Sequence, residues 1–502
     1  MSMRFLPRLS PAQRAVAAVA VLYVLAWSLL PPLLSSSLPL DVVESLSWGR
    51  EWQWGYYKHP PLAPWVLHVF FRVFGNAGPF LLSQACIAAT LWLVWRTGRR
   101  LMAPQRAFIG AVLTMGVAYY TYPALEFNHN VAQMPLWAAL GWCLLAALQE
   151  GRLRYWALLG LLAGLGMMTK YSVAIVLLCL ALYLLLTPAR RVLRQGGPWL
   201  ALAVMLAVLA PHLVWLWQSD WLPMAYTSSR AVAERGSPRL AATAFLATQV
   251  ANHLPLALIV AAALGLTRRQ RKAAPAAGHR LHTGWPGYLL TLALGPGLLV
   301  TLLGMVGGLH LHDMWGVPMW GFSGLLVAAW LPEPGLAALR PRLLWGVAVW
   351  LALVSLALGI YLARDAQWRQ RPGRTGWPQA ALAREAQASW QALSTCRLDT
   401  VAGDYWLAGV IATASPDWPS VFLTQDERYS PWVTLPRLQA HGALWVWQGD
   451  GVPEPPLLAR LRASSPDLRQ HEGQWRVAWP HDRAGAPLTV HWRAYVPAAC
   501  AR

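Results

Sequence analysis

Residues 38–75 read LPLDVVESLSWGREWQWGYYKHPPLAPWVLHVFFRVFG, soon after an apolar stretch, residues 15–34, that is long enough to cross a lipid bilayer. No small-residue cleavage site follows that stretch, which favours a retained first membrane span over a signal peptide. Tryptophan and tyrosine are dense in 38–75, as is typical of the membrane–water interface. We therefore expect a first outer loop over residues 35–78, in which 62–74 form a helix that lies on the membrane surface.

Further apolar stretches recur on both sides of this loop within residues 1–361. The composition agrees, because 56% of the 502 residues are apolar and 12% are charged, whereas a soluble domain has about 25% charged residues. It excludes a disordered chain and a simple soluble enzyme, and it predicts a polytopic α-helical membrane protein with about eleven transmembrane helices. The expected spans are 15–34, 79–96, 106–120, 131–148, 155–168, 172–187, 199–216, 241–266, 285–304, 318–331 and 343–361.

Lysine and arginine are distributed unevenly between the loops that these spans define. Of the 26 in residues 1–361, 19 fall on the side of the N-terminus and seven on the other. Because cytoplasmic loops carry the excess, we expect a cytoplasmic N-terminus. An odd number of spans then places residues 362–502 in the periplasm, outside a bacterial inner membrane. Topology thus accounts for the net charge of +20, and no nucleic-acid partner is expected.

Residues 362–502 have the composition of a soluble domain, with 15 arginines, no lysine and 12 acidic residues. An amphipathic helix over 378–395 and strands in GALWVWQG and LTVHWRAYV predict an α/β fold. Cys396 and Cys500 lie near the two ends of this domain, in a compartment that permits disulfides, and a bridge between them is expected. The chain is therefore divided into a transmembrane catalytic domain, residues 1–361, and a periplasmic α/β domain, residues 362–502.

The first outer loop also carries a group of ionisable side chains. Asp41 and Glu44 lie one helical turn apart, directly outside the first span, and Lys58 and His59 precede two prolines that stiffen the turn. A lysine presented on a rigid turn at the level of the lipid headgroups supplies a point charge for a phosphate. The alternative is an inert interfacial loop in which the acids pair with Arg50 and Lys58.

Several runs of the sequence resemble a known family. GYYKHPPL, then Glu126 in ALEFNHN, then GLGMMTKYS follow one another as in the family-39 glycosyltransferases of the GT-C superfold. These include protein O-mannosyltransferases, aminoarabinose transferases of lipid A and rhizobial galacturonosyltransferases. The tail runs AGDYWLAGVIA, SVFLTQDERYSPW and GALWVW resemble bacterial members of the group.

The resemblance implies a polytopic GT-C enzyme that takes a sugar from a polyprenyl-phosphate carrier and transfers it to an acceptor on the outer face. In the family the acid after the first span is the catalytic base, a role that maps onto Asp41. The family's acid pair is adjacent, as Asp-Glu, whereas here Glu44 stands three residues after Asp41, so both carboxylates are candidates.

Inverting transfer from a phosphate-linked sugar needs a carboxylate base for the acceptor hydroxyl and cations for the leaving phosphate. Asp41 is the expected base, with Lys58 and Arg230 as the phosphate clamp and His59 and Lys170 as further donors. Two of these have plain alternatives. Arg230 could pair with Glu234 at i+4, and Lys170 could extend along the interface to reach water.

Two other outer loops carry candidate contacts to the sugar or the acceptor. These residues are Glu126, Asn128, His129, His310, His312 and Asp313. Asn128 could instead cap a helix, and the group from His310 to Asp313 could instead hold a metal ion. A divalent metal would suit that second group, but we expect none to be required, and no other cofactor is expected.

The predicted partners are a polyprenyl-phosphate-linked sugar, the lipid bilayer and a glycolipid or glycan acceptor, such as lipid A, core or surface glycan. A protein O-glycosyltransferase is one alternative. A transporter or flippase of lipid-linked sugars is another, but it should carry ionisable residues at mid-membrane. The spans hold almost none, because the acids lie in the loops.

Overall fold

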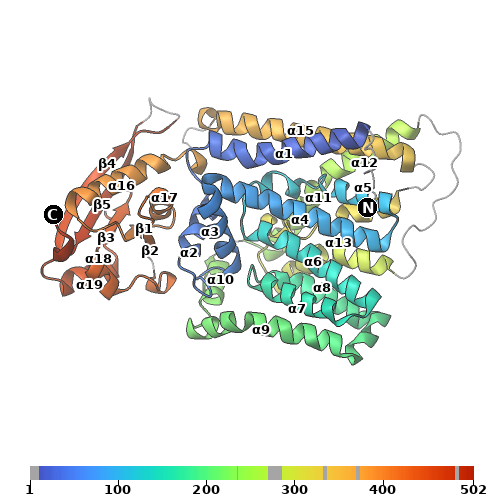
Figure 1. Cartoon of the computed structure of the whole chain (residues 1–502), viewed down its shortest axis with the longest axis horizontal. Coiled ribbons are helices and arrows are strands. Elements are labelled where there is room, and N and C mark those ends of the chain that lie inside the picture. The colour runs from blue at the N-terminus through green and yellow to red at the C-terminus, as the bar shows by residue number, and fades with distance from the viewer. Residues whose placement is uncertain are drawn as a thin grey trace, which may run out of the picture. The chain divides into compact units, whose positions relative to one another are not determined.

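The computed structural model divides the chain into two compact units (Figure 1). Unit 1 comprises Met1–Ser28, Phe80–Val214 and Met224–Gly359, and unit 2 comprises Leu29–Pro79, Trp215–Pro223 and Ile360–Arg502. The first outer loop therefore belongs with the C-terminal tail. The structure describes residues 11–233, 236–268, 285–331, 336–368, 373–424, 426–480 and 486–502.

Unit 1 is built from helices, as expected for chain segments whose backbone polar groups must be satisfied without water. Its long helices α1 and α15 lie side by side (Figure 1), joined by a 3.0 Å hydrogen bond from Trp27 Nε1 to Ser355 Oγ. Helices α1, α9 and α15 also contribute residues to unit 2. The helices are α1 (Pro11–Leu34), α4 (Gly78–Leu101), α5 (Pro104–Thr114), α6 (His129–Glu150), α7 (Leu153–Met167), α8 (Val173–Leu186), α9 (Gly196–Gln218), α10 (Leu222–Ala233), α11 (Pro238–Asn252), α12 (Leu254–Arg268), α13 (Pro286–Gly307), α14 (Ser323–Trp330) and α15 (Leu336–Trp368).

The prediction of a polytopic helical membrane protein is confirmed, and helix is present at each of the eleven expected spans. Among the described residues, however, only seven helical segments are long and apolar enough to cross a bilayer, or eight if the bent pair of α8 and Pro188–Arg194 counts as one. Helices α5, α7 and α14 have 11, 15 and 8 residues. A straight membrane span needs about 20 residues, so each of these three helices is too short to cross the bilayer alone.

Two of these short helices pack closely against each other. A Cβ atom on Gly324 of α14 would lie 2.1 Å from the carbonyl oxygen of Gly110 in α5, so the two backbones meet where neither residue has a side chain. Small residues at such crossings are what helix packing in membranes favours. Helices α5 and α14, which lie at the predicted spans 106–120 and 318–331, therefore pack against each other inside unit 1.

Unit 2 joins the first outer loop to a five-stranded sheet. The strand order is β2-β1-β3-β5-β4, with β1 parallel to β2 and β3, and β5 antiparallel to β3 and β4. Strands β3 and β5 and helix α16 confirm the elements expected in the tail. The bounds are α2 (Leu40–Gly49), α3 (Leu62–Phe74), α16 (Gln379–Leu393), β1 (Thr400–Gly403), α17 (Leu407–Ala414), β2 (Ser420–Leu423), α18 (Leu435–His441), β3 (Ala443–Trp447), α19 (Pro456–Ser464), β4 (Arg469–Val477) and β5 (Leu488–Val496).

The sheet is covered by helices on both faces, α16 and α17 on one and α18 and α19 on the other (Figure 1). Buried Trp445 and Tyr495 pack with leucines of α18 and α19. Helix α17 also packs against α2, and a Cβ on Gly409 would lie 2.7 Å from Cγ1 of Val43. The outer loop is thus anchored to the tail by close packing.

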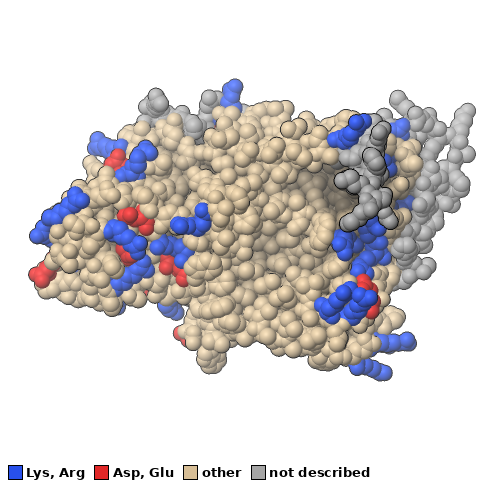
Figure 2. All heavy atoms as spheres, in the orientation of Figure 1, with Lys and Arg blue, Asp and Glu red and all other residues tan. Residues whose placement is uncertain are grey.

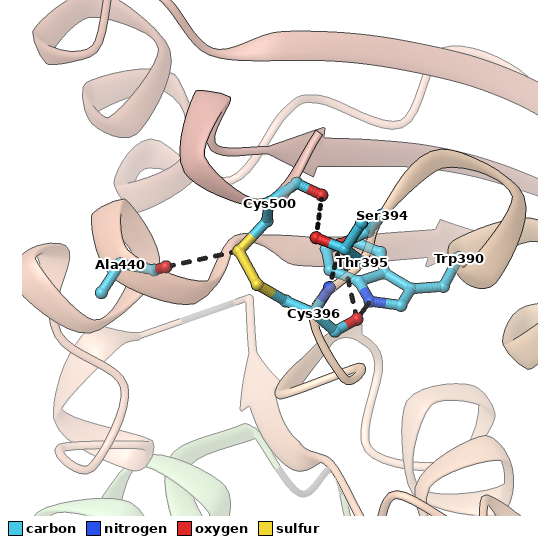
Figure 3. The surroundings of a disulfide bond; sticks show 6 residues. All are labelled: Trp390, Ser394, Thr395, Cys396, Ala440 and Cys500. Atoms are coloured by element: carbon cyan, nitrogen blue, oxygen red, sulfur yellow. Dashed lines mark hydrogen bonds between the residues drawn. A yellow bond between two sulfur atoms is a disulfide. The ribbon is translucent and has the colours of Figure 1, made fainter. Parts of the chain in front are cut away.

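A disulfide joins Cys396 and Cys500, the pair expected to be linked (Figure 3). Next to it the carbonyl oxygen of Cys500 accepts hydrogen bonds from the backbone N–H and the hydroxyl of Thr395. The bridge encloses a loop with a sequence separation of 104. It therefore ties the end of the chain to the start of the sheet domain.

Candidate functional site

The first outer loop begins with α2 and continues into a tight turn. Asp41 lies in the first turn of α2, half-buried, and Glu44 follows one turn later and is 9% exposed. Residues Tyr56 and His59 exchange two backbone hydrogen bonds of 3.0 and 3.2 Å, which close the turn that carries Lys58. The structure therefore brings together the four candidate residues of this loop.

Lys58 is held by one carboxylate and three aromatic rings. Its Nζ donates to Oε1 of Glu44 at 2.5 Å, and the hydroxyl of Tyr57 donates to the same oxygen at 3.2 Å. The ammonium lies 5.0 Å from the ring centroid of Tyr405, 5.2 Å from Tyr57 and 6.0 Å from Trp48. We call these three rings the aromatic cage; they hold a cation through their ring faces and limit its contact with water.

Glu44 is the unusual group in this cluster. Burial raises the pKa of the Glu44 carboxyl above its ordinary value, although the charge and hydrogen bond of Lys58 oppose the rise. The nearby carboxyl of Asp41 raises this pKa further, because two negative charges one turn apart repel each other. A carboxyl so placed gains a proton more readily than an exposed glutamate does, so its hold on Lys58 is adjustable.

The tail supplies part of this cluster. Tyr405 follows strand β1, and the ring of Tyr429 stacks on Tyr57 with centroids 4.2 Å apart. A small pocket opens beside them. It is lined by Glu44, Ser47 and Trp48 from the loop and by Tyr405, Val421, Leu423 and Trp432 from the tail.

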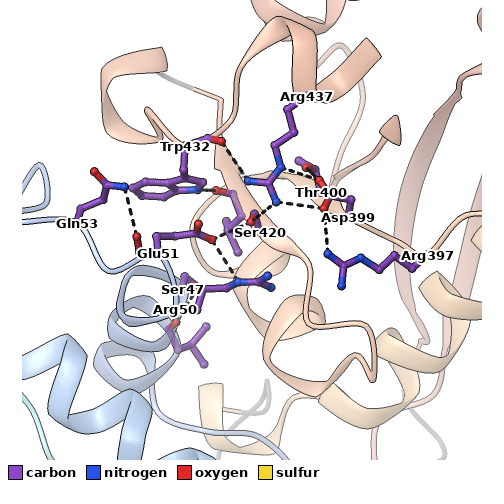
Figure 4. Close-up of polar contacts among 12 residues, drawn as sticks. Ser47, Arg50, Glu51, Gln53, Arg397, Asp399, Thr400, Ser420, Trp432 and Arg437 are labelled. Carbon is purple, nitrogen blue, oxygen red and sulfur yellow. Dashed lines mark hydrogen bonds and ion pairs between the residues drawn. The ribbon is translucent and has the colours of Figure 1, made fainter. Parts of the chain in front are cut away.

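A polar network holds the loop and the tail together at the other end of α2 (Figure 4). Ser420 of β2 donates from its hydroxyl to Glu51 at 2.8 Å, and Arg437 donates to Ser420 at 2.9 Å. Arg437 also makes a two-pronged contact with Asp399, at 2.8 and 3.1 Å. Burial alone would raise the pKa of the Asp399 carboxyl, but the hydrogen bonds and charge of Arg437 outweigh it and lower that pKa.

Unit 1 holds a second group of candidates, at the start of α6. The side-chain oxygen of Asn128 caps this helix, accepting from the backbone N–H groups of Asn130 and Val131, so the capping alternative is realised. Lys170 donates from Nζ to Oδ1 of Asn130 at 2.5 Å. Glu126 lies half-buried two residues before the cap, and His129 is buried in the first turn of the helix.

The third group, His310, His312 and Asp313, lies in a loop between α13 and α14. A hydrogen bond from the helical body holds the backbone of this loop, because Tyr119 donates from its hydroxyl to the backbone carbonyl of Asp313 at 2.7 Å. Buried Gln249 also reaches that carbonyl, at 3.5 Å. His312 packs edge-on against Trp315. In the part of the chain that the structure describes, no three His, Cys, Asp or Glu side chains come together as metal ligands would.

Arg230 lies on α10, and its side chain is outside the described residues. Two histidines of the helical body are hydrogen-bonded within it: His212 to the hydroxyl of Tyr171, and His253 to the carbonyl of Gln249 and the hydroxyl of Ser323. The roles assigned to the individual site residues stay predictions.

Sequence reasoning missed the aromatic residues that the tail contributes. Tyr405 stands in AGDYWLAGVIA, while Tyr429 and Trp432 stand in SVFLTQDERYSPW. In the sequence these two runs carry a resemblance to the family, and no site residue is predicted in them. Their density of tyrosine and tryptophan beside acidic residues was the signal that could have marked them as part of the site.

Comparison with known proteins adds a family model and curated relatives. The model described as dolichyl-phosphate-mannose-protein mannosyltransferase matches residues 58–215. The lipopolysaccharide core galacturonosyltransferase RgtA of Rhizobium johnstonii is 26% identical over 428 residues, which cover 81% of this chain and 81% of that protein. The lipid A galacturonosyltransferase RgtD of the same organism is 26% identical over 197 residues, covering 38% of this chain and 40% of its own length.

Among solved structures, ArnT from Cupriavidus metallidurans, bound to undecaprenyl phosphate, has the same fold. The match has a TM-score of 0.61 and covers 95% of this chain and 97% of that one, at 15% sequence identity. The likeness therefore includes both the helical body and the C-terminal sheet domain.

Proposed function

The chain belongs to the GT-C glycosyltransferases of the PMT/ArnT-like group, and on this basis we propose that it moves a sugar from a polyprenyl-phosphate carrier to a glycolipid acceptor. The observation that supports the proposal most is the Lys58 cluster, in which an ammonium is held at one carboxylate inside the aromatic cage, one helical turn from Asp41. The activities named for the relatives make lipid A or lipopolysaccharide core the first acceptor to consider.

The proposed chemistry is a single displacement with inversion at the anomeric carbon. Asp41 takes the proton of the acceptor hydroxyl, and the oxygen of that hydroxyl forms the new bond as the bond to the carrier phosphate breaks. The leaving phosphate gains negative charge, which the ammonium of Lys58 balances at close range. Arg230 and Lys170 are the further cations proposed for the carrier.

Glu44 has a separate role in this proposal. It holds Lys58 by an ion pair before the donor arrives, so that a buried ammonium is never left without a counter-ion. When the carrier phosphate takes over that ammonium, the raised pKa lets Glu44 take up a proton from the surrounding water. The exchange would keep the net charge of the cluster low at each stage.

We also propose where the reaction takes place. The excess of lysine and arginine on one side of the spans supports a cytoplasmic N-terminus in a bacterial inner membrane, with unit 2 in the periplasm. The acidic residues of the outer loops then face the periplasmic substrates.

The proposal is tested with the purified protein reconstituted in lipid nanodiscs. The donor is undecaprenyl-phosphate-linked galacturonic acid, and the acceptor is lipid A or core glycolipid, followed by mass spectrometry. The expected result is a mass increase of one sugar residue on the glycolipid, lost in Asp41→Asn and retained in Glu385→Gln, which removes an exposed carboxylate on α16. Full activity of Asp41→Asn would remove Asp41 from the mechanism. No transfer with any polyprenyl-linked sugar offered would reject the donor class.

A further inference from the structure

Five arginines gather at one end of unit 1, where α4 and α6 finish and α7 begins. Figure 2 shows basic side chains concentrated at this end of the helical body. We call this group the arginine cluster; its members are Arg96, Arg99, Arg100, Arg152 and Arg154, with Glu150 as the acidic residue among them.

The cluster is built on aromatic rings. Trp142 of α6 has two guanidinium groups over it, with the central carbon of Arg96 at 5.2 Å from its centroid and that of Arg100 at 5.4 Å. Arg96 also lies 5.3 Å from Trp92, and Arg154 lies 4.8 Å from Tyr155. Stacking on rigid rings fixes where the positive charges stand, which loose surface arginines do not achieve.

Among the described residues, one carboxylate stands within the cluster of five arginines. Glu150 lies within 2.6 Å of Arg100, 3.6 Å of Arg152 and 3.7 Å of Arg154. Within the described ranges of the chain, no carboxylate lies within 4.0 Å of Arg96 or Arg99. Of the two guanidinium groups over Trp142, that of Arg100 is therefore paired with Glu150, and that of Arg96 has no carboxylate partner among the described residues.

A second observation comes from Trp142 itself. Its Nε1–H is buried and makes no hydrogen bond to any residue that the structure describes, although a buried N–H normally has an acceptor. This N–H lacks an oxygen acceptor among the described residues, and a phosphate group drawn by the neighbouring arginines would supply one.

The surroundings indicate the source of such a phosphate. Trp92 is 53% exposed, and on α7 Leu153 is 59% exposed and Leu158 and Leu161 also face outward. An exposed tryptophan and exposed leucines beside a group of arginines form a surface that is complementary to an anionic lipid. The apolar side chains match the acyl chains, and the arginines match the charged headgroup.

We propose that the arginine cluster and Trp142 bind the phosphate of an anionic phospholipid from the leaflet at this end of the helices. Arg96 and Arg99 balance the charge of the phosphate, Trp142 donates to one of its oxygens, and the acyl chains lie along α4 and α7. Asn128 and His129 stand at the opposite end of α6, about 20 Å from Trp142 and about 30 Å from Glu150 at 1.5 Å per residue. The proposed binding site uses none of the residues assigned to the transfer chemistry, and the proposal does not depend on that chemistry.

The test is native mass spectrometry of the purified chain with phosphatidylglycerol or phosphatidylcholine, for wild type and two double variants. Arg96→Gln with Arg99→Gln removes the two arginines without a carboxylate. Arg190→Gln with Arg191→Gln is the matched control, since it removes the same charge from an exposed segment without aromatic partners.

Wild type is expected to retain phosphatidylglycerol in preference to phosphatidylcholine, also in the presence of excess inorganic phosphate. The first variant should weaken phosphatidylglycerol binding at least about fivefold, given the strength of arginine contacts with anionic lipid, while the control stays within twofold of wild type. Equal loss in both variants, no preference for the anionic lipid in wild type, or displacement by inorganic phosphate would overturn the proposal. Unchanged thermal unfolding in phosphatidylcholine shows that each variant is folded.

Discussion

At the scale of single residues, the two carboxylates of α2 are expected to do different work although they stand one turn apart. Asp41 is half-buried at the start of the helix, whereas Glu44 is buried and already engaged with Lys58 and Tyr57. The difference in surroundings assigns the proton transfer to Asp41 and the holding of Lys58 to Glu44. Their spacing in the sequence alone left both roles open.

The two assignments give different kinetics. Asp41→Asn should lower kcat by about 10²-fold or more, as removal of a general base does, with little change in the KM for the carrier-linked donor. Glu44→Gln should instead raise that KM several-fold and leave kcat within a few-fold of wild type, because it loosens Lys58 without removing the base. Steady-state rates against donor concentration check both. The reverse pattern would exchange the roles of the two residues.

At the scale of elements, a charged pair within the tail supports the hydrogen bond by which the sheet contacts the first outer loop. Asp399 precedes β1, Arg437 lies in α18, and Ser420 at the start of β2 connects them to Glu51 (Figure 4). The pair is largely buried, with 6% of the Asp399 side chain and 25% of the Arg437 side chain exposed. Removing one member of a buried ion pair leaves a buried charge without a partner, and this lowers the free energy of unfolding more than the loss of a surface ion pair does.

The Asp399–Arg437 pair predicts that the stability of the folded chain depends on pH. The pKa of Asp399 is lowered in the folded state, so its contribution to stability is present above the ordinary value near 4 and is lost as the pH falls below it toward the folded value. Arg437→Met should lower the unfolding temperature at pH 7 and weaken its further decline in acid. Thermal unfolding of the full chain in detergent at pH 7, 5, 4 and 3 measures this. An acid decline in Arg437→Met as steep as in wild type would contradict it.

Many elements were predictable because their determinants are local. The alternation in residues 488–496 predicted a strand, and β5 has the same bounds. The helix expected over 62–74 is α3, which ends where Gly75 adopts a positive φ of 55°; its position on the membrane surface stays a prediction. The short helices α5 and α14 were less predictable, since their ends depend on packing against each other and not on their own apolar length.

At the scale of the whole molecule, unit 2 gives the tail a part in the candidate site. Lys58 was predicted from its turn, but Tyr405 and Tyr429 come from residues more than 340 positions later, and no local pattern relates them to it. Nor does any local pattern reveal this packing for the first outer loop as a whole, so sequence reasoning assigned the loop to the helical domain that it adjoins in the chain. The structure instead groups that loop with the tail.

A consequence is that the tail should be needed for use of the donor. Tyr405→Ala removes one ring of the aromatic cage and should raise the KM for the carrier-linked sugar about threefold to tenfold, given the size of a cation–π contact. Tyr405→Phe keeps the ring face and should stay near wild type, so the comparison separates the ring from the hydroxyl. Equal activity of the alanine and phenylalanine variants and wild type would show that the tail does not act on Lys58.

The central claim, transfer from a polyprenyl carrier to an envelope glycolipid through Asp41, is tested most directly by mass spectrometry of lipids from living cells. Glycolipids and carrier-linked sugars are compared between a wild-type strain, a deletion strain, and the deletion strain expressing either the wild-type chain or Asp41→Asn. The account predicts that the deletion and the Asp41→Asn strains both lose one sugar from the glycolipid and accumulate its carrier-linked form, while the wild-type chain restores both. Glycolipids unchanged by the deletion, or restored in full by Asp41→Asn, would contradict it.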